Sequence, residues 1–538
     1  MSVPAPERGG RRRIPFRRVV LPLRAARQSD FPASGAPHAP EIAGMPYAPS
    51  ILKIVITTLL FPLLAAIGAA RGQMPVIPGE QRSFPAPDID RQWQKEQNEA
   101  LERARRRRAP PGERPAAPVL NDAAVAANSA VAELILETAL QYQDWDTIER
   151  VLPLYAGHPR HDRQLYRFVK GAMLRARWRL GPAIDLYRQM LDADPTLNNV
   201  RFDLAVMQFE NKSYRQAKRQ FLLLADNPRE PLFRELSLNY LKRIAERDRP
   251  SLNLTADLLH TDNYNQGSDV EYIYLWGLPF RNNNRRQSSS GQSLSVTLEQ
   301  DVNLAGNHFL GYSAYFNALN YARDNHYDER TALLGLDYQY QSLRDTFSVG
   351  PVYTYRRLGG ESYARDVGLS ASYGRWLTPR WQAALGYRLM DRRYYRQSVG
   401  ELYDGNIAIH SLNLMRPVSN RFLLYGGVFH EREKLGAADV SSRQNGVNGG
   451  FTYIAQSGLD VRMQLRYGRK RFDEENAFFG VRRRDAVTRL ALRLQYRPWT
   501  FQGITPRLVY QREKTTSNIP AFYGKSSNQL MLSFSKEF

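Results

Sequence analysis

Histidines have the widest range of possible chemistry in this sequence, since one imidazole can bind a metal ion or act as a general base. The 538-residue chain has eight, and those from residue 251 onward stand singly: His260, His308, His326, His410 and His430. No two have the spacing of a metal-binding HxxxH pair, and no serine-nucleophile signature lies near one. Cysteine is absent, which excludes thiolate nucleophiles and disulfides. We therefore expect no enzyme, and no catalytic, metal or cofactor-binding site.

Arginines form the second group with possible chemistry, because their guanidinium groups bind anions. Four of them alternate with apolar or aromatic residues late in the chain: Arg462, Arg466, Arg489 and Arg493. Such a row could guide an anionic polymer, and it is equally what the polar wall of a water-filled lumen looks like. The formal net charge is +22, but no nucleic-acid motif accompanies it, so we expect no nucleic-acid partner.

The elements that carry these residues follow a period of two from position 251 to the end. Apolar and polar residues alternate clearly over 333–340, 461–467 and 490–496. The mean hydropathy of −0.51 argues against a helical membrane protein, which needs runs of about 20 apolar residues. It permits a transmembrane β-barrel, where alternate residues face lipid and water.

Six short turns divide this segment into hairpins, with longer charged stretches such as 469–475 between them. The turns lie at 304–308, 342–345, 377–380, 417–420, 456–458 and 497–500. Six junctions imply seven hairpins, and so 14 antiparallel strands over 251–538. A soluble sandwich or propeller is the alternative, but long, regular up-and-down hairpins favour the membrane barrel.

The last strand ends the chain on an aromatic residue. Leu530, Leu532, Phe534 and Phe538 share one face of it, and Lys536 breaks the apolar pattern. This arrangement resembles the C-terminal signal that the barrel-assembly machinery reads, so we expect that machinery as a partner.

Residues 123–250 have a helical period instead and contain a repeat. Two segments superpose at an offset of 34 residues, with Ala183 on Ala217 and Tyr187 on Phe221. Counted from Gln164, the small, aromatic and proline positions match a tetratricopeptide repeat (TPR). The whole chain is thus expected to be an α + β multidomain protein, in which a TPR-like solenoid precedes the barrel.

A repeat array of this kind usually presents a concave groove for a protein partner. The residues of the first helices that we expect to line it are Phe168, Arg175, Phe202, Val206 and Phe209. The alternative for each aromatic residue is a place in the core between helices.

The first 122 residues predict export and a linker. An apolar core over 54–67 ends in small residues, with cleavage near Ala70, and indicates a secretory signal peptide in residues 1–70. Translation from Met45 would give that peptide ordinary proportions. The Pro- and Arg-rich stretch 71–122 is expected to be an unstructured linker. Its run Arg105–Arg108 could touch lipopolysaccharide phosphates or an acidic partner, but a solvated part of the linker is the favoured interpretation.

Motifs within the barrel segment resemble those of one known family. They are Gly306-Asn-His-Phe-Leu310, Asp324-Asn-His-Tyr-Asp-Glu329, Gly335-Leu-Asp-Tyr-Gln339, Arg356-Arg-Leu-Gly-Gly360, Trp376-Leu-Thr-Pro-Arg-Trp-Gln382, Ile504-Thr-Pro-Arg-Leu508 and Ser517-Asn518. With the preceding repeats, the chain from about residue 130 resembles the surface lipoprotein assembly modulator (Slam) family.

The resemblance implies an outer-membrane translocator that delivers client lipoproteins or secreted proteins to the cell surface. Periplasmic repeats would engage the client or its chaperone, and the barrel would provide the route, with no nucleotide or other cofactor. Membrane lipid and lipopolysaccharide would surround it. An exopolysaccharide export porin is the rival, since such porins also join TPRs to a barrel, although their arrays are usually longer.

Overall fold

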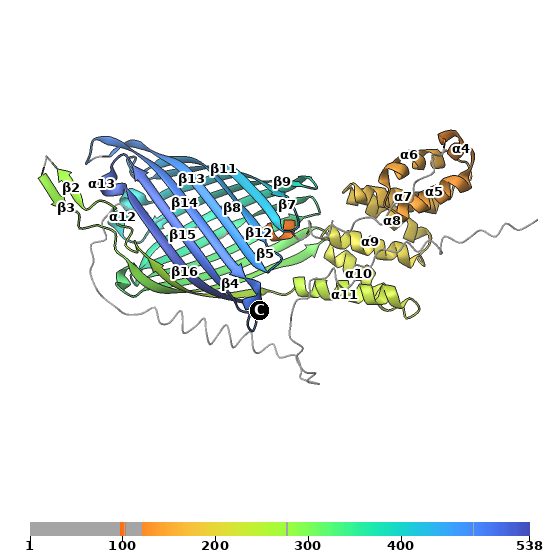
Figure 1. Cartoon of the computed structure of the whole chain (residues 1–538), viewed down its shortest axis with the longest axis horizontal. Coiled ribbons are helices and arrows are strands. Elements are labelled where there is room, and N and C mark those ends of the chain that lie inside the picture. The colour runs from red at the N-terminus through yellow and green to blue at the C-terminus, as the bar shows by residue number, and fades with distance from the viewer. Residues whose placement is uncertain (1–96, 102, 104–120, 276–277, 477) are drawn as a thin grey trace, which may run out of the picture.

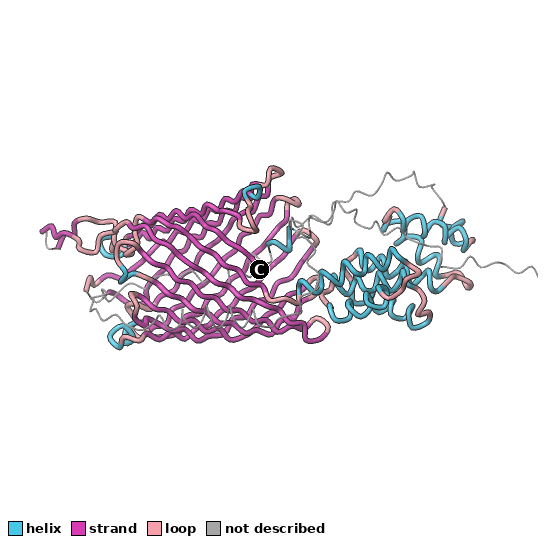
Figure 2. Tube along the Cα trace, turned by 90° about the horizontal axis from the view of Figure 1, so that it is seen from below, coloured by secondary structure: helices cyan, strands magenta, loops and turns pink. Residues whose placement is uncertain are grey.

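The computed structural model describes residues 97–101, 103, 121–275, 278–476 and 478–538. A body of helices stands beyond one end of a barrel of strands (Figures 1 and 2). The expected signal peptide with its core at 54–67, its cleavage near 70 and the start at Met45 all lie outside the described residues. No helix of the described part is long and apolar enough to cross a membrane.

The helical domain is built from antiparallel helix pairs. Its elements are α4 (Asp122–Ala127), α5 (Ser129–Gln141), α6 (Trp145–Ala156), α7 (Arg163–Ala176), α8 (Leu180–Ala193), α9 (Asn198–Glu210), α10 (Tyr214–Ala225) and α11 (Pro231–Arg247). Several begin at side-chain caps, as where the Asp162 carboxylate accepts hydrogen bonds from the first backbone N–H groups of α7.

The repeat positions found in the sequence pack as a TPR requires. A Cβ at Gly171 of α7 would lie 2.3 Å from the ring of Tyr187 in α8, so only glycine lets this ring cross the helix. Ala183, Ala217 and Phe221 are fully buried. The 34-residue offset thus superposes the pair α7–α8 on the pair α9–α10, which confirms the predicted repeats.

The turn inside each helix pair has the same unusual backbone. Its middle residue is Gln143, Trp178 or Lys212, with φ of 54°, 61° and 60°. Residues with a Cβ rarely adopt this left-handed conformation, which costs roughly 1–2 kcal/mol. Three equivalent turns without glycine indicate that the side chains at these positions are needed where they stand.

The barrel consists of long antiparallel strands. They are β1 (Ser251–Thr261), β4 (Ser289–Ala305), β5 (His308–Tyr321), β6 (Glu329–Gln341), β7 (Asp345–Leu358), β8 (Glu361–Thr378), β9 (Trp381–Tyr394), β10 (Gly405–Pro417), β11 (Phe422–Leu435), β12 (Ser442–Ile454), β13 (Leu459–Asn476), β14 (Val481–Tyr496), β15 (Thr505–Ser517) and β16 (Lys525–Glu537). Each pairs with its neighbours in sequence, and β1 pairs with β16, which closes the barrel at the predicted 14 strands.

All six predicted short turns lie at the end of the barrel that faces the helical domain. Loops at the opposite end carry β2 (Tyr272–Leu275), β3 (Leu278–Arg281), α12 (Gln397–Tyr403) and α13 (Pro520–Tyr523), and a 3-10 turn, η4, at Asn325–Tyr327. The charged stretch 469–475 does not form a loop but belongs to the end of β13. Strand pairing continues there because charged side chains on both faces are tolerated beyond the lipid.

The two faces of the barrel wall differ in polarity. Leucine and valine side chains of most strands stay exposed on the outside, as a belt in contact with lipid requires: Leu258, Leu294, Leu310, Leu334, Leu336, Val367, Leu369, Leu385, Leu412, Leu424, Val428, Val447, Leu465, Leu508, Leu530 and Leu532. The residues between them point inward and are largely polar. In the lumen, the buried Asp366 carboxylate accepts hydrogen bonds from Arg356 (2.8 Å) and Arg392 (2.9 and 3.1 Å).

Candidate functional site

The helical domain is fastened to the barrel through the side chain of Asn307, in the turn between β4 and β5. Its amide Nδ2 donates to the carbonyl oxygen of Gln341 at 2.6 Å and to that of Asn211. Its Oδ1 accepts from the Ser213 hydroxyl at 3.0 Å and from Asn211 Nδ2 at 3.5 Å. One asparagine therefore joins the α9–α10 turn to two turns of the barrel rim.

Further contacts extend this junction. The backbone N–H of Leu343, in the β6–β7 turn, donates to Asn211 Oδ1 at 3.2 Å, and the Leu343 side chain packs on the helical core. The ring of Tyr214 at the start of α10 contacts Phe309 of β5, with centroids 6.0 Å apart. The helical domain thus sits directly on the mouth of the lumen.

Two of the left-handed turns point their side chains into this mouth. Trp178 lies edge-on to Trp376, which β8 directs inward at its end, with ring centroids 6.2 Å apart. Lys212, whose side chain is 8% exposed, places its ammonium group 3.4 Å from the Gln341 amide oxygen. Their strained backbone is thereby explained, because the side chain at the tip of each turn meets the barrel.

A short helical segment, residues 97–101 with Arg103, occupies the mouth. Ala100 and Leu101 are 0% and 2% exposed and pack in one cluster with Trp376, Met415, Leu423 and Ile454 of the barrel ends and with Trp178. For these residues, the expectation of an unstructured linker over 71–122 was wrong. Their burial depends on a lumen built far later in the chain.

The polar side chains of this segment contact both bodies. Thr452 of β12 donates to the Gln97 side chain at 3.2 Å, and Arg462 of β13 donates to Asn98 at 3.3 Å. Glu99 accepts from Lys212 at 3.0 Å. Burial would raise the pKa of the Glu99 carboxyl, but Lys212 and then Arg103 lower this pKa to about 2, so it is ionised.

The arginines singled out in the sequence line the lumen but stand beside acids. Arg462 lies 3.3 Å from Asp460, Arg466 lies 3.5 Å from Glu431, and Arg489 lies 2.9 Å from Glu513. Arg493 of β14 lies directly opposite Arg462 of β13 in the strand register. The positive charge of this wall is therefore compensated over much of its length.

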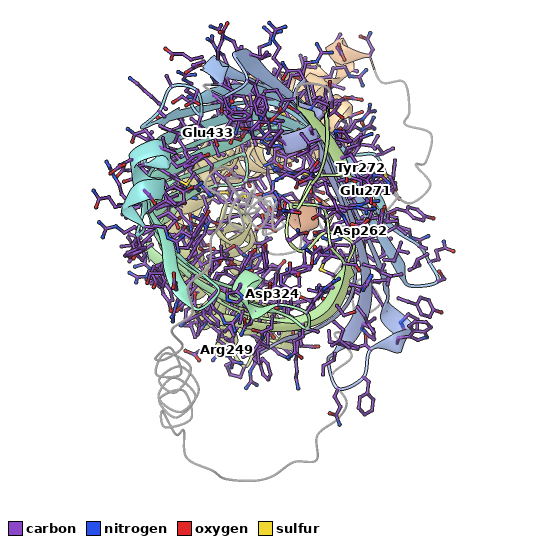
Figure 3. All side chains as sticks on the ribbon, turned by 90° about the vertical axis from the view of Figure 1, so that its left-hand side faces the viewer. Arg249, Asp262, Glu271, Tyr272, Asp324 and Glu433 are labelled. Atoms are coloured by element: carbon purple, nitrogen blue, oxygen red, sulfur yellow. The ribbon has the colours of Figure 1, made fainter. Side chains whose placement is uncertain are left out.

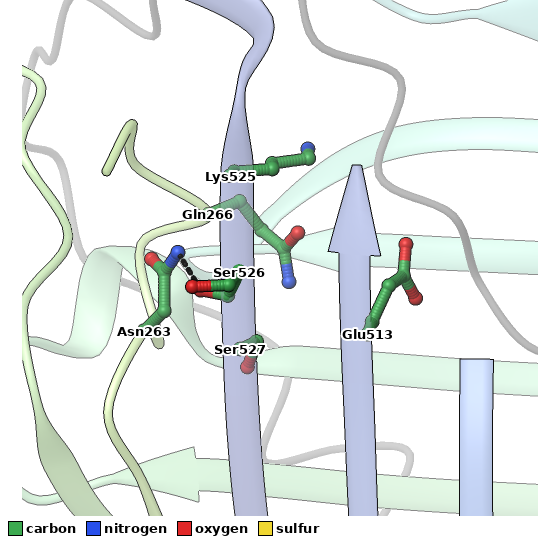
Figure 4. Close-up of a pocket in the computed structure, with 6 residues that line it drawn as sticks. All are labelled: Asn263, Gln266, Glu513, Lys525, Ser526 and Ser527. Carbon is green, nitrogen blue, oxygen red and sulfur yellow. Dashed lines mark hydrogen bonds between the residues drawn. The ribbon is translucent and has the colours of Figure 1, made fainter. Parts of the chain in front are cut away.

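The far end of the barrel is braced at its closing seam by the loop after β1. Asp262 accepts two hydrogen bonds from Asn528 of β16, both at 2.7 Å, and Asn263 donates to the Ser526 carbonyl at 2.8 Å (Figure 4). A cavity beside Asn263, lined also by Gln266, Glu513 and residues 525–527, holds about 10 Å³, room for about one water molecule, so it is no ligand site. Figure 3 looks into this end, with Asp262 and Glu433 on opposite walls.

The five predicted groove residues do not form an open groove. Phe168, Phe202, Val206 and Phe209 are 1–5% exposed and lie in the cores between the helices of this domain. Arg175 is the partly exposed one of the five.

Arg175 binds Glu210 through two hydrogen bonds, at 2.8 and 3.2 Å, and lies 3.6 Å from Asp203. Burial raises the pKa of Asp203 to about 6, despite the opposing effect of Arg175. These contacts lie between helices, so the side chains join neighbouring repeats.

The predicted residues of the last strand share the lipid-facing side of β16. Leu530, Leu532 and Phe538 are 49%, 40% and 61% exposed, and Phe534 is partly exposed.

Sequence reasoning missed the junction and mouth residues. Asn307 and Trp376 stand inside two of the quoted motifs, which was the available signal, whereas Lys212, Trp178 and residues 97–103 carried none.

Comparison with known proteins places both parts of the chain in one family. The family model described as surface lipoprotein assembly modifier matches residues 251–538, and the model of that family's N-terminal TPR repeats matches 119–221. The surface lipoprotein assembly modifier of Pasteurella multocida is 25% identical over 425 residues, which cover 74% of this chain and 81% of the relative. Surface lipoprotein assembly modifier 1 of Neisseria meningitidis is 25% identical over 401 residues, 73% and 79% of the two chains.

A relative with a different name is the hemophilin secretion modulator of Acinetobacter baumannii, 21% identical over 426 residues, 75% of this chain and 85% of the relative. Among solved structures, the outer membrane channel DcaP of Acinetobacter baumannii covers 54% of this chain and 96% of its own at a TM-score of 0.31 and 12% identity.

The barrel spans the outer membrane, and the helical domain lies in the periplasm. Because the barrel model alone matches more than half of the sequence, the chain belongs to the surface lipoprotein assembly modifier family.

Proposed function

We propose that this protein delivers client lipoproteins, or related secreted proteins, across the outer membrane to the cell surface. Its relatives are named for surface lipoprotein assembly and for hemophilin secretion. The periplasmic helical domain engages the client or the chaperone that brings it, and the lumen is the route.

The junction at Asn307 is the observation that carries this proposal. It seats a protein-binding type of repeat on the rim of the lumen, and two of the repeat turns reach into the mouth through Trp178 and Lys212. A passive porin gains nothing from such a domain. A translocator needs the client presented at the lumen, because an unguided chain would have to find a narrow opening by diffusion.

Other partners follow from the same placement. The lipid-facing apolar row of β16, with Leu530, Leu532, Phe534 and Phe538, supports recognition by the barrel-assembly machinery during insertion. Charged strand ends beyond the lipid belt, such as 469–475 of β13, are suited to lipopolysaccharide headgroups. Neither role is needed for the transport step.

Export of an anionic polysaccharide is the less favoured function. It would require luminal arginines available to the polymer, and three of the four predicted ones lie within 3.5 Å of a carboxylate.

The test is surface display of a co-expressed lipoprotein, measured by protease accessibility on intact cells. The natural chain lacks cysteine, so a bulky thiol label can be placed at one chosen position. We expect a label on Ser370→Cys, which points into the lumen from β8, to abolish display. A label on its neighbour Leu369→Cys, which faces lipid, should leave display intact. Display that persists with Ser370→Cys fully labelled would contradict the luminal route, and so would equal loss with both labels.

A further inference from the structure

Residues 97–101 and Arg103 extend across the periplasmic mouth of the lumen. At one side Gln97 is bound by Thr452 of β12, and at the other the Arg103 guanidinium donates to the Leu343 carbonyl at 2.7 Å, in the turn before β7. From β12 to β7 there are five steps around a barrel of 14 strands, so the two anchors stand on well-separated walls. Figure 1 shows this short segment at the helical-domain end, beside β12.

The seat of the segment is made by both bodies of the protein. The barrel supplies Trp376, Met415, Leu423 and Ile454, and the helical domain supplies Trp178. Lys212 of the α9–α10 turn binds Glu99, and the Arg103 guanidinium lies 5.2 Å from the centre of the Trp376 ring. Any shift of the helical domain on the rim would therefore move part of the seat.

The contacts that hold the segment can be replaced by contacts with water or with another polypeptide. Among its described residues, Ala100 and Leu101 supply the buried apolar surface, which is small. The other contacts include hydrogen bonds, the Lys212–Glu99 ion pair and the stacking of Arg103 on the Trp376 ring, and the hydrogen bonds among them can be replaced by water or another polypeptide at little net cost. A permanent structural element of the wall would be expected to bury more.

We propose that residues 97–101 with Arg103 are a built-in plug, which closes the periplasmic mouth at rest and leaves it when a client enters. The closure concerns the barrel alone. The displacement by a client rests on the proposed function, because a chain bound for the lumen must pass the place where Ala100 and Leu101 are packed. The plug thereby keeps an empty barrel from leaking small solutes.

The first test releases the plug without touching the barrel. Ala100→Asp puts a carboxylate into a fully buried position, and the unfavourable burial should shift the segment at least about tenfold toward the released state. Asn98→Asp adds the same residue at an exposed position and keeps an oxygen that accepts from Arg462, so it should leave the plug in place. Single-channel conductance of the purified full-length protein in planar bilayers is the readout. We expect frequent open events for Ala100→Asp and wild-type behaviour for Asn98→Asp.

The second test locks the plug. Gln97→Cys with Thr452→Cys, whose natural side chains touch, can be joined by a short, reducible thiol crosslinker in a chain with no other cysteine. We expect the crosslinked protein to remain closed and to stop displaying the co-expressed lipoprotein, and reduction to restore display. Each single cysteine variant, treated in the same way, should display the client normally.

The outcomes separate the plug from the proposed function. Equal conductance of Ala100→Asp and wild type would overturn the plug, as would open events that the crosslink does not suppress. If the crosslinked protein still displays its client, the displacement step is refuted. If conductance follows the expectation but the wild type displays no lipoprotein, the proposed function fails and the closure stands. Heat-modifiable migration on gels checks that each barrel is folded, and a misfolded Ala100→Asp leaves the decision to the crosslink.

Discussion

Replacing Asn307 by alanine should release the helical domain from the barrel. The substitution removes four side-chain hydrogen bonds, two to the backbone carbonyls of Gln341 and Asn211 and two from Ser213 and Asn211. Neutral hydrogen bonds contribute about 0.5–1.5 kcal/mol each, and partly buried groups left unpaired cost more. The loss in docking free energy is therefore roughly 2–4 kcal/mol, allowing for contacts that do not add independently.

This loss converts into a measurable change of population. At 1.4 kcal/mol for each factor of ten, the undocked fraction rises about thirty- to seven-hundredfold. Spin labels on Lys218→Cys in α10 and Arg380→Cys in the β8–β9 turn, both exposed positions, report the distance between the bodies by pulsed electron paramagnetic resonance. We expect one narrow distance distribution for the labelled parent and a broad one when Asn307→Ala is added.

A neighbouring residue provides the control. His308 lies next to Asn307, but its ring binds the Tyr338 hydroxyl at 2.6 Å, within the barrel itself. His308→Ala should leave the distance distribution narrow and client display unchanged, whereas Asn307→Ala should also reduce display. A narrow distribution in Asn307→Ala would refute the reasoning, because Tyr214, Leu343 and Lys212 would then be sufficient to hold the domain.

Three further predictions concern stability and the seam. Asp203 has a folded-state pKa of about 6, above the ordinary 3.8, so its burial destabilises the helical domain above pH 6 and this penalty fades as the pH falls toward 3.8. Asp203→Asn should add up to about 3 kcal/mol at pH 7.5 and much less at pH 4, seen as hydrogen-exchange protection of α7–α10. Gly171→Ala should destabilise the same helices by about 1–3 kcal/mol through its clash with a ring, whereas Gly181→Ala, with nothing within 4 Å of its Cβ, should be neutral or stabilising. A Thr255→Cys/Ser535→Cys disulfide, at a directly opposite pair of the β1–β16 seam, should leave client display unchanged; display lost on oxidation and regained on reduction would instead indicate lateral opening.

Along the β1–β16 seam, residue pairs joined by backbone hydrogen bonds alternate with pairs that are not. Leu252 and Phe538 exchange both of their backbone hydrogen bonds, so Thr255 and Ser535, three residues further along, are a pair without them. Such pairs bring side chains closest together, which suits a disulfide. The loop after β1 braces the far end of this seam through Asp262 and Asn528, which favours a closed wall and passage through the lumen.

Most of the fold could be predicted from the sequence because it depends on local periodicity. Alternation and six turns were enough for 14 strands, and an offset of 34 residues was enough for the helix pairs. The groove residues show what such patterns cannot predict. Phe168 and Phe202 have the spacing of groove residues, but spacing cannot distinguish a side chain that faces the next helix from one that faces a client. The structure decides for the core at both positions.

The junction and the plug could not be predicted, because their physics is non-local. Asn307 meets a turn 96 residues earlier, and nothing in the composition of either turn shows that they meet. Residues 97–103 are polar and lie in a Pro- and Arg-rich stretch, so alone they cannot bury a core. Residues 97–101 and 103 are helical where Trp178 and the barrel residues Trp376, Met415, Leu423 and Ile454 provide that core.

Backbone strain supplies the link between these two unpredicted features. A left-handed turn without glycine costs free energy, and glycine at the same place would remove most of that cost. Trp178 and Lys212 nevertheless occupy two of three equivalent turns, and both touch the plug or its seat. Glycine there would keep the repeat intact and lose the contact to the mouth. The strain is therefore best understood as serving the contact between the domains, and it makes the turns of the repeats, rather than their concave face, the first place to look for coupling between client binding and opening.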